Sequence, residues 1–249
     1  MRKPGISLPE NESERLSALA SYRLMDTVPE ADFDELTALA AEICGTPIAL
    51  VTLLGEQHQW FKSHHGTELE QTPRSIAFCS HAILEQDGIL VVPDAREDPR
   101  FSENPLVTGD TNIVFYAGVS LVNEAGCALG TLCVIGHEQR QLSDRQLSAL
   151  KTLSKQALML MELRRKTTLL EHQNLILERN NAALQEFARR TVHDLKNPLT
   201  SIILNSQALV IRLRDKVDER TLRLAEMNVS SGKELNELIN HLLRESLKD

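Results

Sequence analysis

The sequence predicts an α+β domain followed by a long helix and an all-α helical hairpin, and three observations support this division. Apolar residues alternate between helical and strand spacing over the first ~140 residues, as they do in α+β domains. From Ser143 to Leu213 the helical spacing continues without a glycine. After a polar break at residues 214–219, a second helical pattern runs to the end. We therefore expect domains at residues 1–142, 143–185 and 186–249.

The first domain is expected to begin with two helices and to continue as an antiparallel sheet. Residues 13–25 and 30–44 place apolar side chains at helical spacing, and Gly45 stands where a helix-ending glycine belongs. A short helix is expected within residues 75–88. About five strands with helices at both ends of the domain favour a sheet with helices packed on one side. The strand candidates are residues 47–54, 58–66, 89–95, 113–123 and 128–136.

The helix after the first domain starts at a capping box. Ser143 is followed three residues later by Gln146, a pair whose side chains and backbone N–H groups bond reciprocally at helix N-termini. Between Ser143 and Leu213 the only helix breaker is Pro198. The predicted helix is therefore far longer than the ~11-residue helix of an average globular protein.

Leucines recur at intervals of seven along this helix and predict a coiled coil. They are Leu163, Leu170, Leu177 and Leu184. A coiled-coil seam has a second position in each heptad, called the half-step here, which lies three residues before each of these leucines. The half-step residues are Leu153, Leu160, Thr167, Asn174, Asn181 and Ala188. Asparagines in the seam weaken a dimer but fix a parallel register, because a misaligned pair buries an unpaired amide.

The alternative to a coiled coil is one amphipathic helix lying on its own domain. The first domain ends before the repeat begins, so little is left for the helix to pack on. We therefore favour a parallel homodimer, in which two helical hairpins form a four-helix bundle.

The composition excludes several classes of function. Lys and Arg number 27 against 35 Asp and Glu, so no basic excess is available to neutralise nucleic-acid phosphates. No apolar run approaches the ~20 residues that span a bilayer, and the start lacks the apolar core of a secretory signal. A cytoplasmic protein is expected. The cysteines are Cys44, Cys79, Cys127 and Cys133. No two of them form a CxxC pair, so no metal site is predicted.

The segment Thr191–Ile202, TVHDLKNPLTSI, carries the candidate chemistry. On a helix His193 and Asn197 share a face, with Asp194 next to the histidine. A neutral imidazole is a nucleophile toward a phosphoryl group, and a neighbouring carboxylate can accept the ring proton as the bond forms. Asn197 can position a water for hydrolysis. The alternative is an ordinary solvated His–Asp pair.

Pro198 is predicted to bend the helix at this reactive turn. Its ring removes the hydrogen bond to the carbonyl of Asp194 and crowds that carbonyl, at a cost of ~3 kcal/mol. A bend lets the bundle tilt between arrangements that a signal along the coiled coil can select.

The stretch FARRTVHDLKNPLTSI resembles the H-box of sensor histidine kinases, in their dimerisation and phosphotransfer domain. The resemblance implies that His193 is the phospho-acceptor, that Asp194 assists its phosphorylation, and that Asp194 with Asn197 serves phosphatase activity. Three nearby cations are weaker candidates for holding phosphate, because charges on an exposed helix usually serve solvation: Arg189, Arg190 and Lys196.

The first domain resembles a GAF sensor domain through FCSHAI, DAREDPRFSENPLV, FYAGVSLV and ALGTLCVIG. GAF domains bind cyclic nucleotides, bilins, haem or no known ligand, so the resemblance leaves the ligand unknown. A bilin is disfavoured because Ser80 separates Cys79 from His81. Ordinary core or loop packing is the alternative for each residue of the expected pocket wall, which is Phe78, Cys79, His81, Asp94, Phe101, Phe115 and Tyr116.

A histidine kinase needs an ATP-binding domain after the bundle. The sequence up to Asp249 contains none of the motifs of that domain. No GxGxxG or P-loop pattern occurs, so we expect no cofactor in the chain itself. ATP and Mg²⁺ are expected to act only through a separate kinase domain.

The expected function is therefore two-component signalling by a dimeric cytoplasmic sensor. His193 would be phosphorylated in trans by a donor histidine kinase and would exchange phosphate with the receiver domain of a response regulator. One alternative is a sensor kinase fragment completed by a separate catalytic domain. Another is a non-catalytic GAF adaptor that acts by protein binding and in which His193 is a relic.

Overall fold

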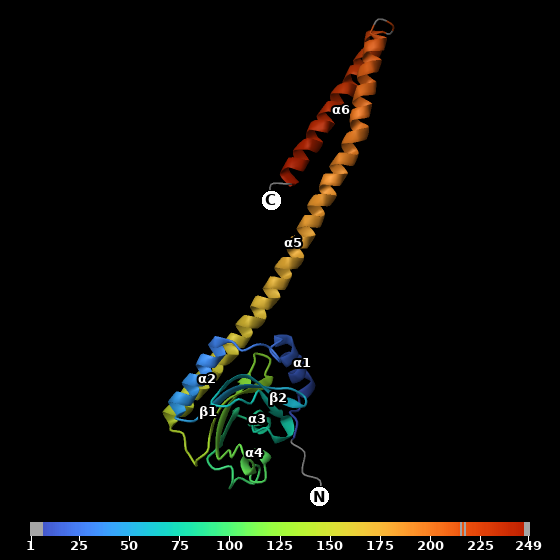
Figure 1. Cartoon of the computed structure of the whole chain (residues 1–249). Helices are drawn as coiled ribbons and strands as arrows, with labels where there is room; N and C mark the ends of the chain where they lie inside the picture. Colours follow the sequence, from blue (N-terminus) through green and yellow to red (C-terminus); the bar gives the residue numbers. More distant parts are fainter. Residues whose placement is uncertain (1–6, 215, 217, 247–249) are drawn as a thin grey trace. The chain divides into compact units, whose positions relative to one another are not determined.

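The computed structural model describes residues 7–214, 216 and 218–246. The chain divides into two compact units, Met1–Leu169 and Leu170–Asp249. The first unit contains a six-stranded antiparallel sheet with the strand order β3-β2-β1-β6-β5-β4 (Figure 1). The strands are β1 Ile48–Leu54, β2 His58–His65, β3 Gln71–Pro73, β4 Ile89–Val92, β5 Phe115–Val122 and β6 Ala128–Gly136.

Strand β1 lies inside the sheet between β2 and β6, and every residue of β1 is buried. Ala49 pairs with Val134 of β6 on one side and with His65 of β2 on the other. The strand candidates at residues 113–123 and 128–136 are confirmed as β5 and β6, which pair with each other in the antiparallel sense. A strand buried along its whole length needs apolar cover on both of its faces.

One face of the sheet is covered by α1 (Glu12–Tyr22), α2 (Ala31–Cys44) and the first turns of α5 (Asp144–Leu213). The expectation that the long helix has little to pack on is wrong for these turns. They contribute four buried residues to the core on this face: Leu150, Leu153, Ala157 and Met161. Figure 1 shows α2 beside the start of α5, where the Gln146 side chain donates to the Ile43 carbonyl at 3.0 Å.

The other face carries a second core beneath η1 (Arg74–Ile76), α3 (Cys79–Ala82) and α4 (Pro105–Thr108). The prediction of helices on one side only is therefore wrong. The short helix expected within residues 75–88 is confirmed as α3, but its place on this face was not foreseen, and the four-residue α4 was not predicted. Buried residues of this second core include Leu50, Phe78, Phe101, Tyr116 and Ile135.

The predicted helix caps are confirmed by their hydrogen bonds. Gly45 ends α2 in the left-handed conformation, with φ of 63°. At the start of α5 the Gln146 N–H donates to the Ser143 hydroxyl at 3.3 Å, and the Ser143 N–H donates to Gln146 Oε1 at 3.0 Å. These two bonds form the reciprocal capping box.

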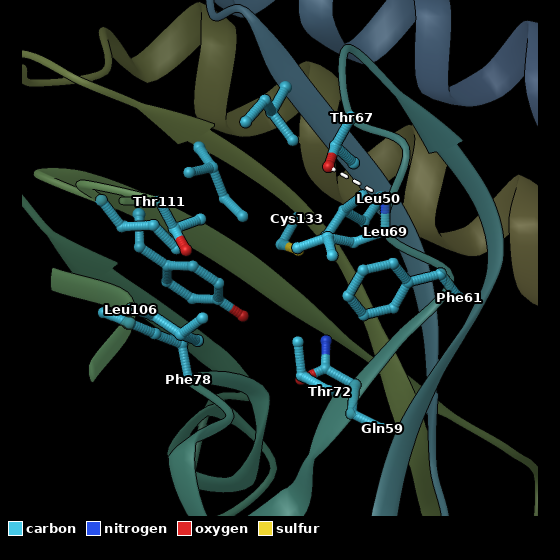
Figure 2. Close-up of a pocket in the computed structure, with 14 residues that line it drawn as sticks. Leu50, Gln59, Phe61, Thr67, Leu69, Thr72, Phe78, Leu106, Thr111 and Cys133 are labelled. Carbon is cyan, nitrogen blue, oxygen red and sulfur yellow. Dashed lines mark hydrogen bonds between the residues drawn. The ribbon is translucent and has the colours of Figure 1, made fainter. Parts of the chain in front are cut away.

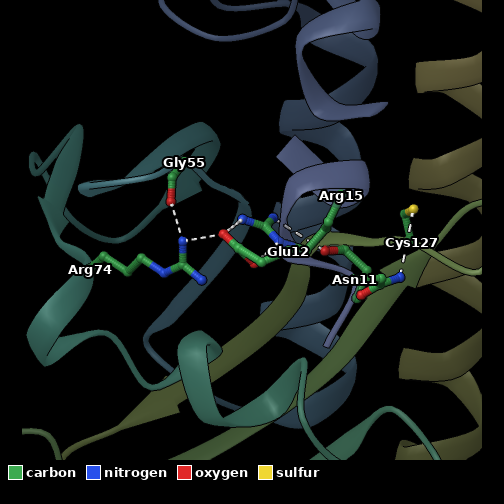
Figure 3. Close-up of polar contacts among 7 residues, drawn as sticks. Asn11, Glu12, Arg15, Gly55, Arg74 and Cys127 are labelled. Carbon is green, nitrogen blue, oxygen red and sulfur yellow. Dashed lines mark hydrogen bonds and ion pairs between the residues drawn. The ribbon is translucent and has the colours of Figure 1, made fainter. Parts of the chain in front are cut away.

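A buried ion network fastens α1 to the sheet (Figure 3). The carboxylate of Glu12 accepts hydrogen bonds from the guanidinium groups of Arg15, at 2.8 and 2.9 Å, and Arg74, at 2.6 Å. Arg74 also donates to the carbonyl of Gly55, and Arg15 to the carbonyl of Ala128. One carboxylate therefore joins α1 to two separate parts of the domain.

In the second unit, α5 packs along α6 (Glu219–Ser246) in the antiparallel sense. Lys196 contacts Asn240, and a Cβ on Gly232 would lie 2.8 Å from Ile203 Cγ1, so glycine allows close packing of the two helices there. Asp218 caps α6 by accepting from the Thr221 N–H at 2.8 Å. Within the described residues, no helix combines the length and the apolar character needed to cross a membrane.

Candidate functional site

The candidate phosphotransfer site lies on α5 in the second unit. His193 is exposed, with 73% of its side chain accessible, and its Nδ1 lies 3.3 Å from the Asp194 carboxylate. Asn197 is also exposed and follows one turn later on the same helix. An imidazole whose Nδ1 faces a carboxylate leaves Nε2 free as the reactive nitrogen.

Pro198 stands inside α5, and the helix continues through it to Leu213. The next residue, Leu199, is buried, whereas Pro198 itself is exposed. The bend expected at the reactive turn stays a prediction.

The cations near His193 differ in their partners. Arg189 and Arg190 both bind the carboxylate of Glu186, with contacts of 3.0 and 2.6 Å. The hydrogen bond from Arg189, followed by that from Arg190, lowers the pKa of Glu186 to about 2. Lys196 Nζ instead donates to the neutral Oδ1 of Asn240 at 3.4 Å.

The predicted heptad seam is exposed over much of its length. The four leucines of the repeat, Leu163, Leu170, Leu177 and Leu184, are all exposed. The half-step residues Leu153 and Leu160, by contrast, pack in the core of the first unit. The free part of the seam therefore begins near Leu163.

A second apolar surface lies on the hairpin in the second unit. On α5 it contains Leu195, Ile202 and Leu209, which continue the half-steps of the heptad at intervals of seven. On α6 the exposed large apolar residues are Leu224, Met227, Leu235 and Leu238. Each helix of the hairpin thus has one apolar stripe toward its neighbour and another that is exposed.

A small cavity of about 40 Å³ opens in the second core of the first unit, on the face away from α1 and α2 (Figure 2). It has room for a few water molecules. Its apolar wall comes from β1, β2, β5 and β6. The lining residues are Ile48, Leu50, Gln59, Phe61, Thr67, Leu69, Thr72, Phe78, Leu106, Thr111, Ile113, Tyr116, Cys133 and Ile135.

Two of the seven predicted pocket residues line this cavity, Phe78 and Tyr116. Phe115 packs in the core on the opposite face of the sheet. Cys79 is buried in a third small cluster, where burial raises the pKa of its thiol. Phe101 lies behind the lining and stacks on Phe78 with ring centroids 4.1 Å apart.

The other two predicted pocket residues lie outside the lining. His81 contacts the edge of the Phe101 ring at 4.8 Å between centroids, and burial, followed by the charge of Arg100, lowers its pKa. Asp94 accepts from the Arg96 guanidinium at 2.6 Å and from the Arg96 N–H at 3.0 Å, which fixes a loop turn.

Sequence reasoning missed most of the cavity wall. Ile48 and Leu50 alternate along β1, so their common face was predictable from strand periodicity. Thr67 and Leu69 lie between β2 and β3, where no periodicity signals a contact.

Two protein families match separate parts of the chain. Residues 29–159 match the GAF domain family, and residues 183–249 match the His Kinase A (phospho-acceptor) domain. The chain belongs to the GAF domain family. In this GAF protein, His193 lies within the residues that match the phospho-acceptor domain.

Individual relatives share the GAF part. A cyclic di-GMP phosphodiesterase from Pseudomonas aeruginosa is 41% identical over 144 residues, which are 57% of this chain and 24% of that protein. The chain thus spans about a quarter of that relative's length.

Two solved GAF domains are similar in fold. That of an Acinetobacter phosphoenolpyruvate-protein phosphotransferase is 15% identical with a TM-score of 0.45, covering 65% of this chain and 99% of that one. The blue-light-absorbing form of the PixJ GAF domain from Thermosynechococcus elongatus is 12% identical with a TM-score of 0.46. The match covers 70% of this chain and 98% of that one.

Proposed function

We propose that His193 accepts a phosphoryl group from a donor outside these two domains and exchanges it with an aspartate of a response-regulator receiver domain. The observation that carries this proposal is the exposed imidazole whose Nδ1 faces Asp194, within a phospho-acceptor domain. The donor is a histidine kinase domain, which holds ATP and Mg²⁺, or a phosphorylated receiver domain.

The reaction follows from the two ring nitrogens. Nε2 attacks the phosphorus, the N–P bond forms, and the bond from phosphorus to the donor's leaving atom breaks. The Nδ1 proton moves toward the Asp194 carboxylate as the ring becomes positively charged. In the onward step the receiver's aspartate attacks the phosphorus, the N–P bond breaks, and the imidazole is restored.

Asn197 supports a hydrolytic branch of the same chemistry. It lies one turn after His193, so its amide can hold a water on the face where the phosphoryl group stands. That water attacks the phosphorus, the N–P bond breaks, and inorganic phosphate leaves the restored imidazole.

The proposed active form is a homodimer. The exposed leucines from Leu163 to Leu184 supply a seam for a parallel coiled coil. The exposed apolar stripes of α5 and α6 in the second unit supply the inner surfaces of a four-helix bundle. A second copy covers both, because a long exposed apolar stripe is costly in water.

Labelling the purified protein tests the proposed function. Wild type and His193→Gln are incubated with ATP and Mg²⁺ alone, with a donor histidine kinase, and with a phosphorylated receiver domain. Intact mass is read at neutral or basic pH, because phosphohistidine is lost in acid. We expect a label in the wild type only when a donor is present, and none in His193→Gln. The absence of label with several donors would indicate an adaptor that acts by binding.

A further inference from the structure

Of the cations within about one turn of His193, two are already bound to a carboxylate. Arg189 and Arg190 share the carboxylate of Glu186, on the turn before the histidine. A phosphoryl group on His193 must compete with Glu186 to use either guanidinium, and the lowered pKa of Glu186 shows that this carboxylate is held in its ionised form.

Lys196 is different because its recorded partner is neutral. Its ammonium donates to the Asn240 side-chain carbonyl on α6 at 3.4 Å, near the long limit for such a bond. Among the residues that the structure describes, Lys196 forms no ion pair with a carboxylate. The Lys196 ammonium can therefore bind a phosphoryl oxygen without first giving up an ion pair.

The position of Lys196 suits a contact with the phosphoryl group. Residues three apart on a helix are neighbours on its surface, so Lys196 lies beside His193 on the turn that follows. Its flexible four-carbon stem lets the ammonium move between the Asn240 oxygen and the space next to the imidazole.

We propose that Lys196 is a catalytic residue that leaves Asn240 and binds an oxygen of the phosphoryl group during transfer to and from His193. This rests on the proposed function of His193. Negative charge is spread over the phosphoryl oxygens in the transition state, and a nearby ammonium stabilises it electrostatically. Asn240 is the resting partner, so α6 holds the ammonium ready beside the reactive turn.

The test uses potassium phosphoramidate, a small donor that requires no docking protein. The imidazole Nε2 takes its phosphoryl group and ammonia leaves. The rate of labelling is measured by intact mass on wild type, Lys196→Gln, Lys196→Arg and Asn240→Ala at low and high salt. Arg190→Gln is the matched control, and far-UV circular dichroism confirms that each variant is folded.

We expect Lys196→Gln to be labelled about fivefold more slowly than wild type, because the loss of one exposed charge contact has an effect of about this size. Lys196→Arg should restore the rate within about twofold, because it keeps the charge. Asn240→Ala should label no more slowly than wild type. Salt should slow the wild type but not Lys196→Gln, since salt screens an exposed charge.

Two results overturn the inference while leaving the role of His193 untouched. One is a Lys196→Gln rate equal to that of wild type, and the other is an Asn240→Ala loss as large as that of Lys196→Gln, which would assign the bond a structural role. A wild type that takes no phosphoryl group at His193 refutes the proposed function and this inference with it.

Discussion

The Tyr22 hydroxyl of α1 donates a hydrogen bond to the carboxylate of Glu162 on α5. Arg165 lies over the Tyr22 ring at 4.9 Å and donates to Glu162 at 2.9 Å. One turn of α5, at the point where the exposed part of the leucine seam begins, is therefore held to the rest of the GAF domain by polar contacts. Burial, followed by the bond to Glu162, raises the pKa of Tyr22 to about 12, so the phenol stays a donor at neutral pH.

Removing only this hydroxyl should loosen the attachment of α5. We expect Tyr22→Phe to lower the free energy of unfolding of the GAF domain by about 1–2 kcal/mol, the value of a partly buried bond to a charged group. Chemical denaturation measures it. The control is Ser21→Ala, whose exposed hydroxyl bonds the Ala18 carbonyl and should matter by less than about 0.5 kcal/mol. Equal losses of stability in the two variants would show that the hydrogen bond from Tyr22 to Glu162 does not hold α5 to the domain.

The Glu12 network makes stability depend on acid pH. Burial alone would raise the pKa of Glu12, but the hydrogen bonds and charges of Arg15 and Arg74 outweigh it and lower that pKa from 4.5 to about 2. A depressed pKa in the folded state contributes stability above pH 4.5, which is lost as the pH falls toward 2.

Glu12→Gln should therefore be less stable than wild type at pH 7, by about 2–3 kcal/mol. The difference should shrink steadily as the pH falls below 4.5. Denaturation curves at several pH values measure it, with Glu14→Gln, an exposed acid of the same helix turn, as the control. A Glu12→Gln deficit that is the same at pH 7 and pH 3 would argue against the network as its source.

The contact between β6 and β1 requires glycine at position 130. A Cβ there would lie 1.8 Å from the Thr52 carbonyl oxygen, so the backbone of one strand must move. We expect Gly130→Ala to cost about 3 kcal/mol or more. Gly136→Ala, on the same strand, places its Cβ 3.5 Å from Phe115 Cβ and should fold normally. Thermal unfolding compares the two, and equal melting temperatures would refute the expected clash.

The leucine seam predicts which surface residues hold the dimer together. Leu177→Lys places a charge in the seam and should weaken association by at least about tenfold, because the ammonium cannot be buried unpaired. Leu175→Lys changes another exposed leucine of the same helix, but one that lies outside the seam. Sedimentation equilibrium should show weaker dimerisation for Leu177→Lys but not for Leu175→Lys. Equal dissociation of both variants would place the interface elsewhere.

The long elements of the fold could be predicted because their signals are local. The capping box at Ser143 and the glycine at position 45 act through neighbouring backbone groups, and both behave as expected. Two short elements were not predicted, since β3 has three residues and α4 has four. Such segments are fixed by the packing of the whole domain rather than by their own periodicity.

The cavity of the GAF domain illustrates both a sequence signal that was missed and a limit of sequence-based prediction. Phe115 and Tyr116 are adjacent on β5, so strand alternation already required them to face opposite sides of the sheet. The role of Thr67 and Leu69 was not predictable, because a loop has no period from which to infer its contacts. For the phosphotransfer site, the sequence brought His193, Asp194 and Asn197 together because all three lie within two turns of one helix.

The most direct test of the account is to locate the phosphoryl group and follow it. The protein, carrying phosphate from a donor kinase, is chased with a receiver domain, in wild type, His193→Gln and His172→Gln, the last being an exposed histidine of the same helix. The account predicts phosphate on His193 in wild type and in His172→Gln, followed by its appearance on the receiver's aspartate. Phosphate that persists in His193→Gln, or that never reaches the receiver, would contradict it.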